Sequence, residues 1–211
     1  MRIAKLAFAA VLSFLPVRAL ADEVPAAAPV ATPAPAAPIG PKVLISTSMG
    51  DIILQLDAVH APRTVANFVR YAKSGHFDGT VFYRAEKNFV IQAGSWDAKK
   101  HFRQPVYAPI PLESSLPNNR GTIAMARGTE PASGTTEFFI NLTDNPLNAD
   151  PNAAPNTTGY AAFGQVVTGM DVADKIGGVP VTDGGVMPAK VWPVDPVTIL
   201  KVSVLPAAPA P

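Results

Sequence analysis

Short runs rich in β-branched and aromatic residues fill the sequence from Lys42 to Leu205, and only two stretches break their pattern. One is MDVADKI (170–176). The other, 61–77, carries apolar residues at the spacing of one helix face: Val65, Phe68, Val69 and Ala72. Because strands and helices do not alternate, the pattern favours an antiparallel sheet over βαβ units. It predicts six to eight short strands, closed into a barrel and capped by two helices.

Turn residues predict where several elements begin and end. KVLISTSMGDIILQLD holds two strand-like runs joined around Met49-Gly50-Asp51, which predicts a hairpin. Pro62 suits the first turn of the first helix, and Gly75 suits its end. The segment 95–119 is rich in proline and polar residues and is expected to be irregular. The other predicted strands lie in VFY (81–83), FVI (89–91), GTIAMAR (121–127), TEFFINLT (136–143), GYAAFGQVV (159–167) and DPVTILKVSVL (195–205).

Residues 1–21 have the three parts of a secretory signal peptide. Arg2 and Lys5 precede the apolar run LAFAAVLSFL, and the small residues of Ala19-Leu20-Ala21 predict cleavage before Asp22. The alternative is an uncleaved membrane anchor, but this run is shorter than the roughly 18 apolar residues that span a bilayer. No later run is long enough to span one. We therefore expect a soluble protein, exported to the periplasm, with no membrane span after cleavage.

The residues that follow the signal form a predicted tether. Residues 22–41 contain seven Ala and six Pro, which favours an extended, semi-rigid spacer. A proline motif that binds a partner is the alternative. Residues 206–211 have the same composition, so the folded domain is predicted to be 42–205.

Without the signal, the chain has 14 basic and 16 acidic residues, a net charge of −2. With no stripe of Lys and Arg, nucleic acid is not an expected partner.

Several kinds of active site are disfavoured by composition. The chain has no cysteine, so it has neither a disulfide nor a thiol nucleophile, and its core has to stabilise the fold unaided. The three histidines, His60, His76 and His101, lack the spacing of metal ligands. No G-x-S-x-G motif is present. We expect neither a metal nor a cofactor.

A permanent cation interrupts the apolar stretch VFYRAEKNFVIQAGSWD (81–97). Arg84 ends its first apolar run, and Gln92 ends the second. From the residues alone, Arg84 is either an edge-strand arginine paired with an acid or a functional group beside an apolar groove. Phe89 and Phe139 are likewise either core residues or groove walls. Phe138 points to the opposite strand face from Phe139 and is assigned to the core.

The motifs resemble those of the cyclophilins, most closely the bacterial periplasmic ones. The matching pieces appear in family order: APRTVANFVRYAKSGHFDGTVFYR, NFVIQAG, RGTIAMAR, TEFFINLTDN and GYAAFGQVVTGMDVADKI. Together they cover nearly all of 42–205. The resemblance implies a closed eight-stranded antiparallel barrel with a helix at each end and a groove on its outer face. It also implies peptidyl-prolyl cis-trans isomerase activity.

The chemistry of that reaction suits an arginine in an apolar groove. Rotation about an Xaa-Pro bond abolishes amide resonance, against a barrier of about 18–20 kcal/mol. No bond is broken, so neither a nucleophile nor a metal is needed. In the twisted state the proline nitrogen regains its lone pair and accepts a hydrogen bond, which a guanidinium donates. A donor that binds the twisted state better than the planar one accelerates the reaction.

The resemblance implies a role for each site residue. Arg84 is the catalytic arginine, and Gln92 orients it. Phe89, Val90 and Phe139 form the apolar walls. Ala126 and Arg127 form the edge that binds the substrate backbone. Tyr160 occupies a position that is often His or Tyr in the family.

Three departures from the family pattern bear on this site. AEKNF (85–89) replaces a loop with Pro and Gly, which we expect to bring Glu86 to Arg84 as an ion pair. Glu137 replaces a glutamine and is expected to charge the groove edge, favouring peptides with a basic residue near the proline. Leu147 takes either the position of a wall aromatic or, if a gap is allowed, that of the leucine after it. In both alignments the wall loses area.

Three functions remain open on this reasoning. The first is a periplasmic isomerase that acts on proline-containing segments of unfolded or exported proteins. The second is a non-catalytic module that binds proline segments in the same groove. The third is a ligand-carrying barrel of the lipocalin kind. A monomer without a cofactor is expected.

Overall fold

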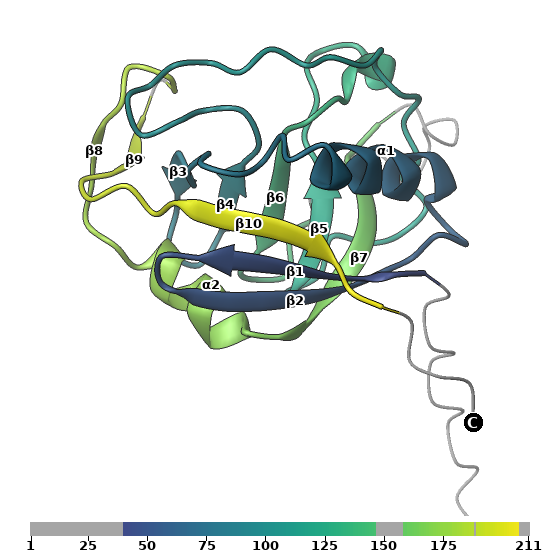
Figure 1. The fold of residues 1–211 in the computed structure, drawn as a ribbon, viewed down its shortest axis with the longest axis horizontal. Helices are drawn as coiled ribbons and strands as arrows, with labels where there is room; N and C mark the ends of the chain where they lie inside the picture. The colour runs from purple at the N-terminus through teal and green to yellow at the C-terminus, as the bar shows by residue number, and fades with distance from the viewer. Residues whose placement is uncertain (1–39, 147–157, 188, 207–211) are drawn as a thin grey trace, which may run out of the picture. The chain divides into compact units, whose positions relative to one another are not determined.

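A computed structural model describes residues 40–146, 158–187 and 189–206. Eight antiparallel strands form one curled sheet in the order β10-β1-β2-β7-β5-β6-β4-β3 (Figure 1). β8 and β9 pair separately. The strands are β1 Lys42–Thr47, β2 Gly50–Leu56, β3 Arg84–Ala85, β4 Val90–Ala93, β5 Thr122–Met125, β6 Phe138–Asn141, β7 Ala161–Thr168, β8 Val181–Asp183, β9 Lys190–Pro193 and β10 Ile199–Val204. The helices are α1 Pro62–Lys73, the 3₁₀ turn Pro131–Ser133, and α2 Met170–Gly177.

Some predictions fall on residues outside these ranges. They concern the signal peptide, the tether up to residue 39, the tail beyond residue 206, and Leu147. Within the described residues, none of the helices combines the length and apolar character needed to cross a membrane.

The predicted closed barrel is wrong, because the sheet is a curled half-barrel whose edge strands β10 and β3 do not form a ladder with each other. β3 has only two residues and is too short to continue the pairing. The segment before it meets the start of β10 through an isolated bridge between Val81 and Thr198. Two backbone hydrogen bonds flank this bridge, Phe82 N to Val197 O at 2.9 Å and Ile199 N to Thr80 O at 2.8 Å. The strand predicted in VFY (81–83) is therefore wrong: the segment is irregular, and β3 begins directly after it, at Arg84.

The predicted β1–β2 hairpin is confirmed, but its turn lies earlier in the chain. Thr47 pairs with Gly50, so Ser48 and Met49 make the turn. The Thr47 hydroxyl stabilises it, accepting from Met49 N at 3.0 Å and donating to Gly50 O at 2.7 Å. Gly50 has φ +129°, a conformation that suits glycine. This side-chain bond shifts the turn from the predicted centre.

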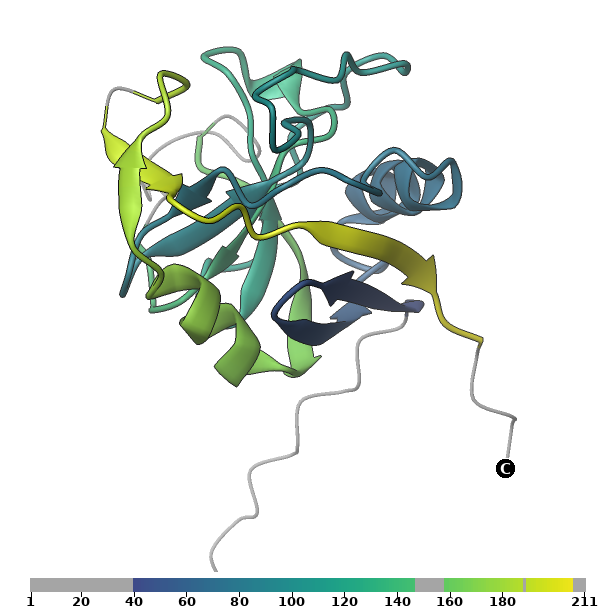
Figure 2. The ribbon, with the colours of Figure 1, turned by 60° about the vertical axis from the view of Figure 1, so that its left-hand side comes forward.

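Two helices lie against the curled sheet, as predicted (Figure 2). α1 contacts β10 and β7, whereas α2 contacts β2 and β4. The apolar stripe of α1 points into the core, and Phe68 at its centre is fully buried. Phe138 is also fully buried and meets Phe68 edge to face at 5.4 Å between ring centroids, so its assignment to the core is confirmed.

The strands β4 to β7 present one face to this core and the other to a smaller cluster. Phe138 and Ile140 of β6 point to the core, whereas Phe139 between them points to the opposite face. The second cluster contains Val90, Ala124, Phe139 and Ala162. It forms the floor of the site described next.

Candidate active site

A groove of about 340 Å³ lies over this second cluster. Each wall comes from a different strand or loop, so the curl of the sheet assembles the groove from distant parts of the chain. Its lining residues are Arg84, Phe89, Val90, Gln92, Ala126, Arg127, Phe139, Tyr160 and Met187. All the predicted site residues within the described ranges are therefore brought together, except Glu137.

Register explains why Arg84, Gln92 and Phe139 meet. Arg84 of β3 pairs with Gln92 of β4, and Gln92 pairs with Phe139 of β6. Residues directly opposite each other in an antiparallel ladder point to the same face. The cation, the amide and the aromatic ring consequently form one row across three strands.

The Arg84 guanidinium is held by two polar groups. Its Nε donates to the Glu86 carboxylate at 2.7 Å, and its Nη1 donates to Gln92 Oε1 at 3.3 Å. The ion pair expected from the sequence is therefore present, with side chains 21% and 33% exposed. The guanidinium carbon lies 5.3 Å from the centre of the Phe89 ring. Nη2 makes no hydrogen bond with the described residues, so this donor faces no competing acceptor there.

The turn between β3 and β4 places Glu86 and Phe89. Glu86 N donates to Val90 O at 2.9 Å, and Phe89 N donates to Glu86 O at 3.0 Å. Asn88 takes φ 60°, a left-handed conformation that asparagine tolerates. Asn88 thus allows the tight turn that brings the Glu86 carboxylate to Arg84.

Tyr160 and Arg127 form the far wall of the groove. The Tyr160 ring meets Phe139 edge to face at 5.3 Å, and the Arg127 guanidinium lies 5.4 Å from the Tyr160 ring centre. Arg127 Nε donates to Gly159 O at 2.8 Å, and its Nη1 donates to the carbonyl of Gly128 at 3.0 Å. The side chain of Arg127 therefore ties two loops together beside Tyr160.

Three buried asparagines connect the backbone of two groove walls. Asn145 Nδ2 donates to Phe89 O at 3.3 Å, and Asn118 Nδ2 donates to Tyr160 O at 3.2 Å. Asn141 joins them, donating to Asn118 Oδ1 at 3.2 Å and accepting from Asn145 Nδ2 at 2.6 Å. The sequence reasoning did not identify this network, because its members are polar residues scattered over three segments.

Glu137 does not line the groove, contrary to expectation. Both of its carboxylate oxygens are buried, and neither makes a hydrogen bond with the described residues. Burial raises the pKa of Glu137 to about 7, and the nearby polar groups of Ser95 and Tyr83 act in the opposite direction. A carboxylate enclosed in this way is not positioned to select basic residues of a peptide.

The neighbour that links Glu137 to the groove is Tyr83. Its hydroxyl accepts a hydrogen bond from Gln92 Nε2. Burial and, after it, the charge of Glu137 raise the pKa of Tyr83 well above its usual range. The phenol is therefore neutral and retains its proton.

Met187 lines the groove, and the sequence reasoning missed it. It lies between β8 and β9, in a glycine-containing segment that gave no strand or helix signal. Met187 packs with Val186 near the buried Trp192. Its apolar side chain is a wall that only the tertiary structure reveals.

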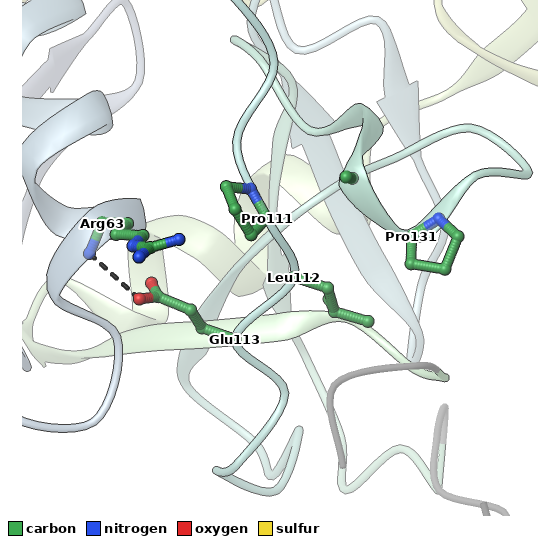
Figure 3. Close-up of a pocket in the computed structure, with 6 residues that line it drawn as sticks. Arg63, Pro111, Leu112, Glu113 and Pro131 are labelled. Carbon is green, nitrogen blue, oxygen red and sulfur yellow. Dashed lines mark hydrogen bonds between the residues drawn. The ribbon is translucent and has the colours of Figure 1, made fainter. Parts of the chain in front are cut away.

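A second hollow of about 500 Å³ lies at the start of α1 (Figure 3). Among the described residues that line it, the one acid is Glu113, which is already engaged as a cap of that helix. The carboxylate accepts from Arg63 N at 3.1 Å, and from the amide and hydroxyl of Thr64 at 2.8 Å each. The rest of its lining is Pro111, Leu112, Pro131 and Ala132. None of the described residues that line this hollow is aromatic, so the smaller groove is the better candidate site.

The fold matches that of solved cyclophilins. A Cryptosporidium parvum cyclophilin-type peptidyl-prolyl cis-trans isomerase, crystallised in the presence of the dipeptide Ala-Pro, superposes with a TM-score of 0.61 at 22% identity. The match covers 79% of this chain and 99% of that one. A cyclophilin from Hirschia baltica gives a TM-score of 0.61 at 19% identity, and the match covers 80% of this chain and 75% of that one. Together these define a cyclophilin fold.

Sequence comparison gives the family. Residues 42–204 match the family described as cyclophilin type peptidyl-prolyl cis-trans isomerase/CLD. A peptidyl-prolyl cis-trans isomerase of Streptomyces antibioticus is 41% identical over 165 residues, which are 77% of this chain and 98% of that protein. Peptidyl-prolyl cis-trans isomerase A of Dickeya dadantii is 41% identical over 178 residues, which are 82% of this chain and 90% of that protein. The chain belongs to the cyclophilin-type peptidyl-prolyl cis-trans isomerases. The predicted resemblance and enzyme class are confirmed, and the lipocalin-like alternative is wrong.

Proposed function

We propose that this isomerase accelerates Xaa-Pro isomerisation in exported proteins as they fold, with Arg84 as its catalytic residue. The observation that carries the proposal is the position of the Arg84 guanidinium, at the rim of an apolar groove and 5.3 Å from the Phe89 ring. Low-dielectric surroundings strengthen a hydrogen bond from such a donor. The donor therefore favours the twisted amide, whose nitrogen is an acceptor, over the planar one.

The other groove residues bind and orient the substrate in this proposal. The proline ring packs on the floor and walls formed by Phe89, Val90 and Phe139. Gln92 holds the guanidinium through its 3.3 Å hydrogen bond. Ala126 and Arg127 present the edge along which the substrate backbone runs, and Tyr160 closes the far side. No step needs a metal or cofactor, because the reaction breaks no bond.

The setting we propose is the periplasm. Its support is the signal-like pattern of residues 1–21, together with the similarity to bacterial isomerases. The proposed partners are proline-containing segments of unfolded or exported proteins. We propose a monomer, because the described residues of one chain already supply the rim, floor and walls of the groove.

The decisive experiment is an NMR exchange assay on a peptide with one Ala-Pro bond, with wild type compared with Arg84→Ala. We expect catalysis by the wild type and a loss of roughly 100-fold or more in the variant, as for removal of a donor specific to the transition state. Arg120→Ala serves as a matched control, because Arg120 is paired with Asp174 away from the groove. Equal rates for wild type and Arg84→Ala would refute the assignment.

One observation favours a second function, a proline-binding module without useful turnover. The 2.7 Å bond from Arg84 Nε to Glu86 competes with a donor role for the guanidinium. A wild type that binds the peptide, but exchanges it no faster than the uncatalysed rate, would support this alternative.

A further inference from the structure

Three side chains form a hydrogen-bonded path from the groove into the protein, and a buried acid interacts with its inner end. Arg84 Nη1 donates to Gln92 Oε1, and Gln92 Nε2 donates to the Tyr83 hydroxyl. The Tyr83 oxygen accepts from Gln92, so its own proton points elsewhere. After burial, the charge of Glu137 is the main influence that raises the pKa of this hydroxyl, and both carboxylate oxygens of Glu137 are buried without a hydrogen-bond partner among the described residues. Arg84 and Gln92 donate in the same direction, toward the interior, and the buried carboxylate of Glu137 is the acceptor that has no partner among the described residues.

Local backbone geometry brings Glu137 to the path. Gly94, two residues beyond Gln92, has φ +150°, and a Cβ placed on it would lie 2.6 Å from Glu137 Cα. Only glycine permits that approach. Next to it, the Ser95 and Thr136 hydroxyls are hydrogen-bonded at 2.7 Å. The segments around Gly94 and Glu137 are therefore held in close contact, just before β6 begins at Phe138.

We propose that Tyr83 and Glu137 are positioning residues that orient the Arg84 guanidinium through Gln92. This inference rests on the catalytic role proposed for Arg84. In this proposal an ionised Glu137 accepts a hydrogen bond from the Tyr83 hydroxyl, which leaves the phenol oxygen free to accept from Gln92. That arrangement fixes the Gln92 amide with its oxygen toward Arg84. A protonated Glu137 can instead donate to the phenol oxygen and compete with Gln92 there.

Burial raises the pKa of Glu137 to about 7, so the change in its ionisation falls near neutral pH. The other ionisable groups along the path are Tyr83 and Arg84, with Glu86 paired to Arg84 at its end. Near Gly94 lies His76, whose pKa is lowered first by burial and then by Arg103. Because its pKa is lowered, His76 is neutral at and above the usual pKa of a histidine. The group that titrates near neutral pH is therefore Glu137.

The test compares wild type, Glu137→Gln and Tyr83→Phe, each as the full chain, between about pH 6 and pH 8.5. The protease-free exchange assay gives kcat and KM for an Ala-Pro peptide. The ¹⁵N–¹H resonance of Arg84 Nε, assigned by its absence in Arg84→Lys, reports the guanidinium directly. Asp174→Asn is the control, because it also neutralises a carboxylate but lies with Arg120 outside the path.

We expect the wild-type kcat to rise with pH through about 7, with the Arg84 resonance moving over the same range. In Glu137→Gln both should become independent of pH. Its kcat at high pH should fall roughly threefold, because a neutral acceptor binds the phenol more weakly than a carboxylate. Tyr83→Phe should lose roughly three- to tenfold in kcat with KM nearly unchanged. Asp174→Asn should keep the wild-type profile.

The inference is overturned if the Arg84 resonance shifts with pH in Glu137→Gln as it does in wild type. It is also overturned if this resonance does not shift with pH in wild type. Thermal unfolding checks each variant, and if Tyr83→Phe fails to fold, Glu137→Gln decides alone. A wild type that shows the resonance change without isomerase activity overturns the proposed function but supports the coupling. The two failures are thereby distinguishable.

Discussion

Arg84 Nε donates to the Glu86 carboxylate at 2.7 Å, across the turn that joins β3 and β4. The two side chains are 21% and 33% exposed, so solvent weakens the pair without removing it. The same guanidinium reaches Gln92 with Nη1. If Arg84 is the catalytic donor, as proposed, Glu86 both positions the arginine and competes with the substrate for it.

Releasing this competition should increase activity. We expect Glu86→Gln to raise kcat/KM by up to roughly fivefold, since an exposed ion pair contributes about 0–1 kcal/mol. The exchange assay on an Ala-Pro peptide measures it, with Asp171→Asn on α2 as a control for loss of an exposed charge. A lower kcat/KM in Glu86→Gln would instead show that Glu86 chiefly positions Arg84.

Burial of Glu137 should make folding stability depend on pH. Its pKa is raised from 4.5 to about 7, so the folded protein holds this proton more tightly than the unfolded chain. The contribution is complete below about pH 4.5 and is lost as pH rises through about 7. Between these limits, wild type should lose about 3 kcal/mol of unfolding free energy relative to Glu137→Gln. Urea unfolding at both ends of the range measures this difference, and parallel curves for the two proteins would contradict the prediction.

Met187 should contribute to peptide affinity. We expect Met187→Ala to raise KM roughly two- to fivefold with kcat nearly unchanged, because it removes apolar area from the groove wall. Val181→Ala is the matched control, since Val181 belongs to the neighbouring β8 but does not line the groove. Equal KM values for wild type and Met187→Ala would exclude Met187 from the binding surface.

Glu113 should stabilise α1 without contributing to the reaction. Its carboxylate satisfies the amides of Arg63 and Thr64 at the helix start (Figure 3). Glu113→Ala should therefore reduce the free energy of unfolding by about 1–2 kcal/mol. Glu130→Ala, which removes an exposed carboxylate, should change it by less than about 0.5 kcal/mol. Chemical denaturation measures both, and equal stabilities would contradict the capping role.

The sequence predicted best those features that depend on neighbouring residues. The 3.6-residue period located α1 around Phe68, and the glycine-containing turn located the β1–β2 hairpin. The expected pair of Arg84 with Glu86 also spans one short turn. The groove residues from Arg84 to Tyr160 were predicted by family resemblance, since their chemistry depends on motifs rather than on periodicity.

Contacts between distant segments were predicted poorly. A carboxylate at position 137 was expected at the groove edge, because alternation along a strand predicts a face but not what covers it. Its burial depends on the close approach that Gly94 permits. The cap on α1 from Glu113 and the groove wall from Met187 are contacts of the same kind.

The sequence by itself determined that the chain is mostly β, that it has two helices, and that its motifs resemble those of the cyclophilins. These follow from local periods, turn residues and motifs. Only the tertiary structure decided that the sheet stops at a half-barrel, and that hydrogen bonds run from Arg84 through Gln92 to Tyr83. The physical reason is that strand pairing and side-chain partners are selected by the packing of segments far apart in the chain, and no local pattern encodes that choice.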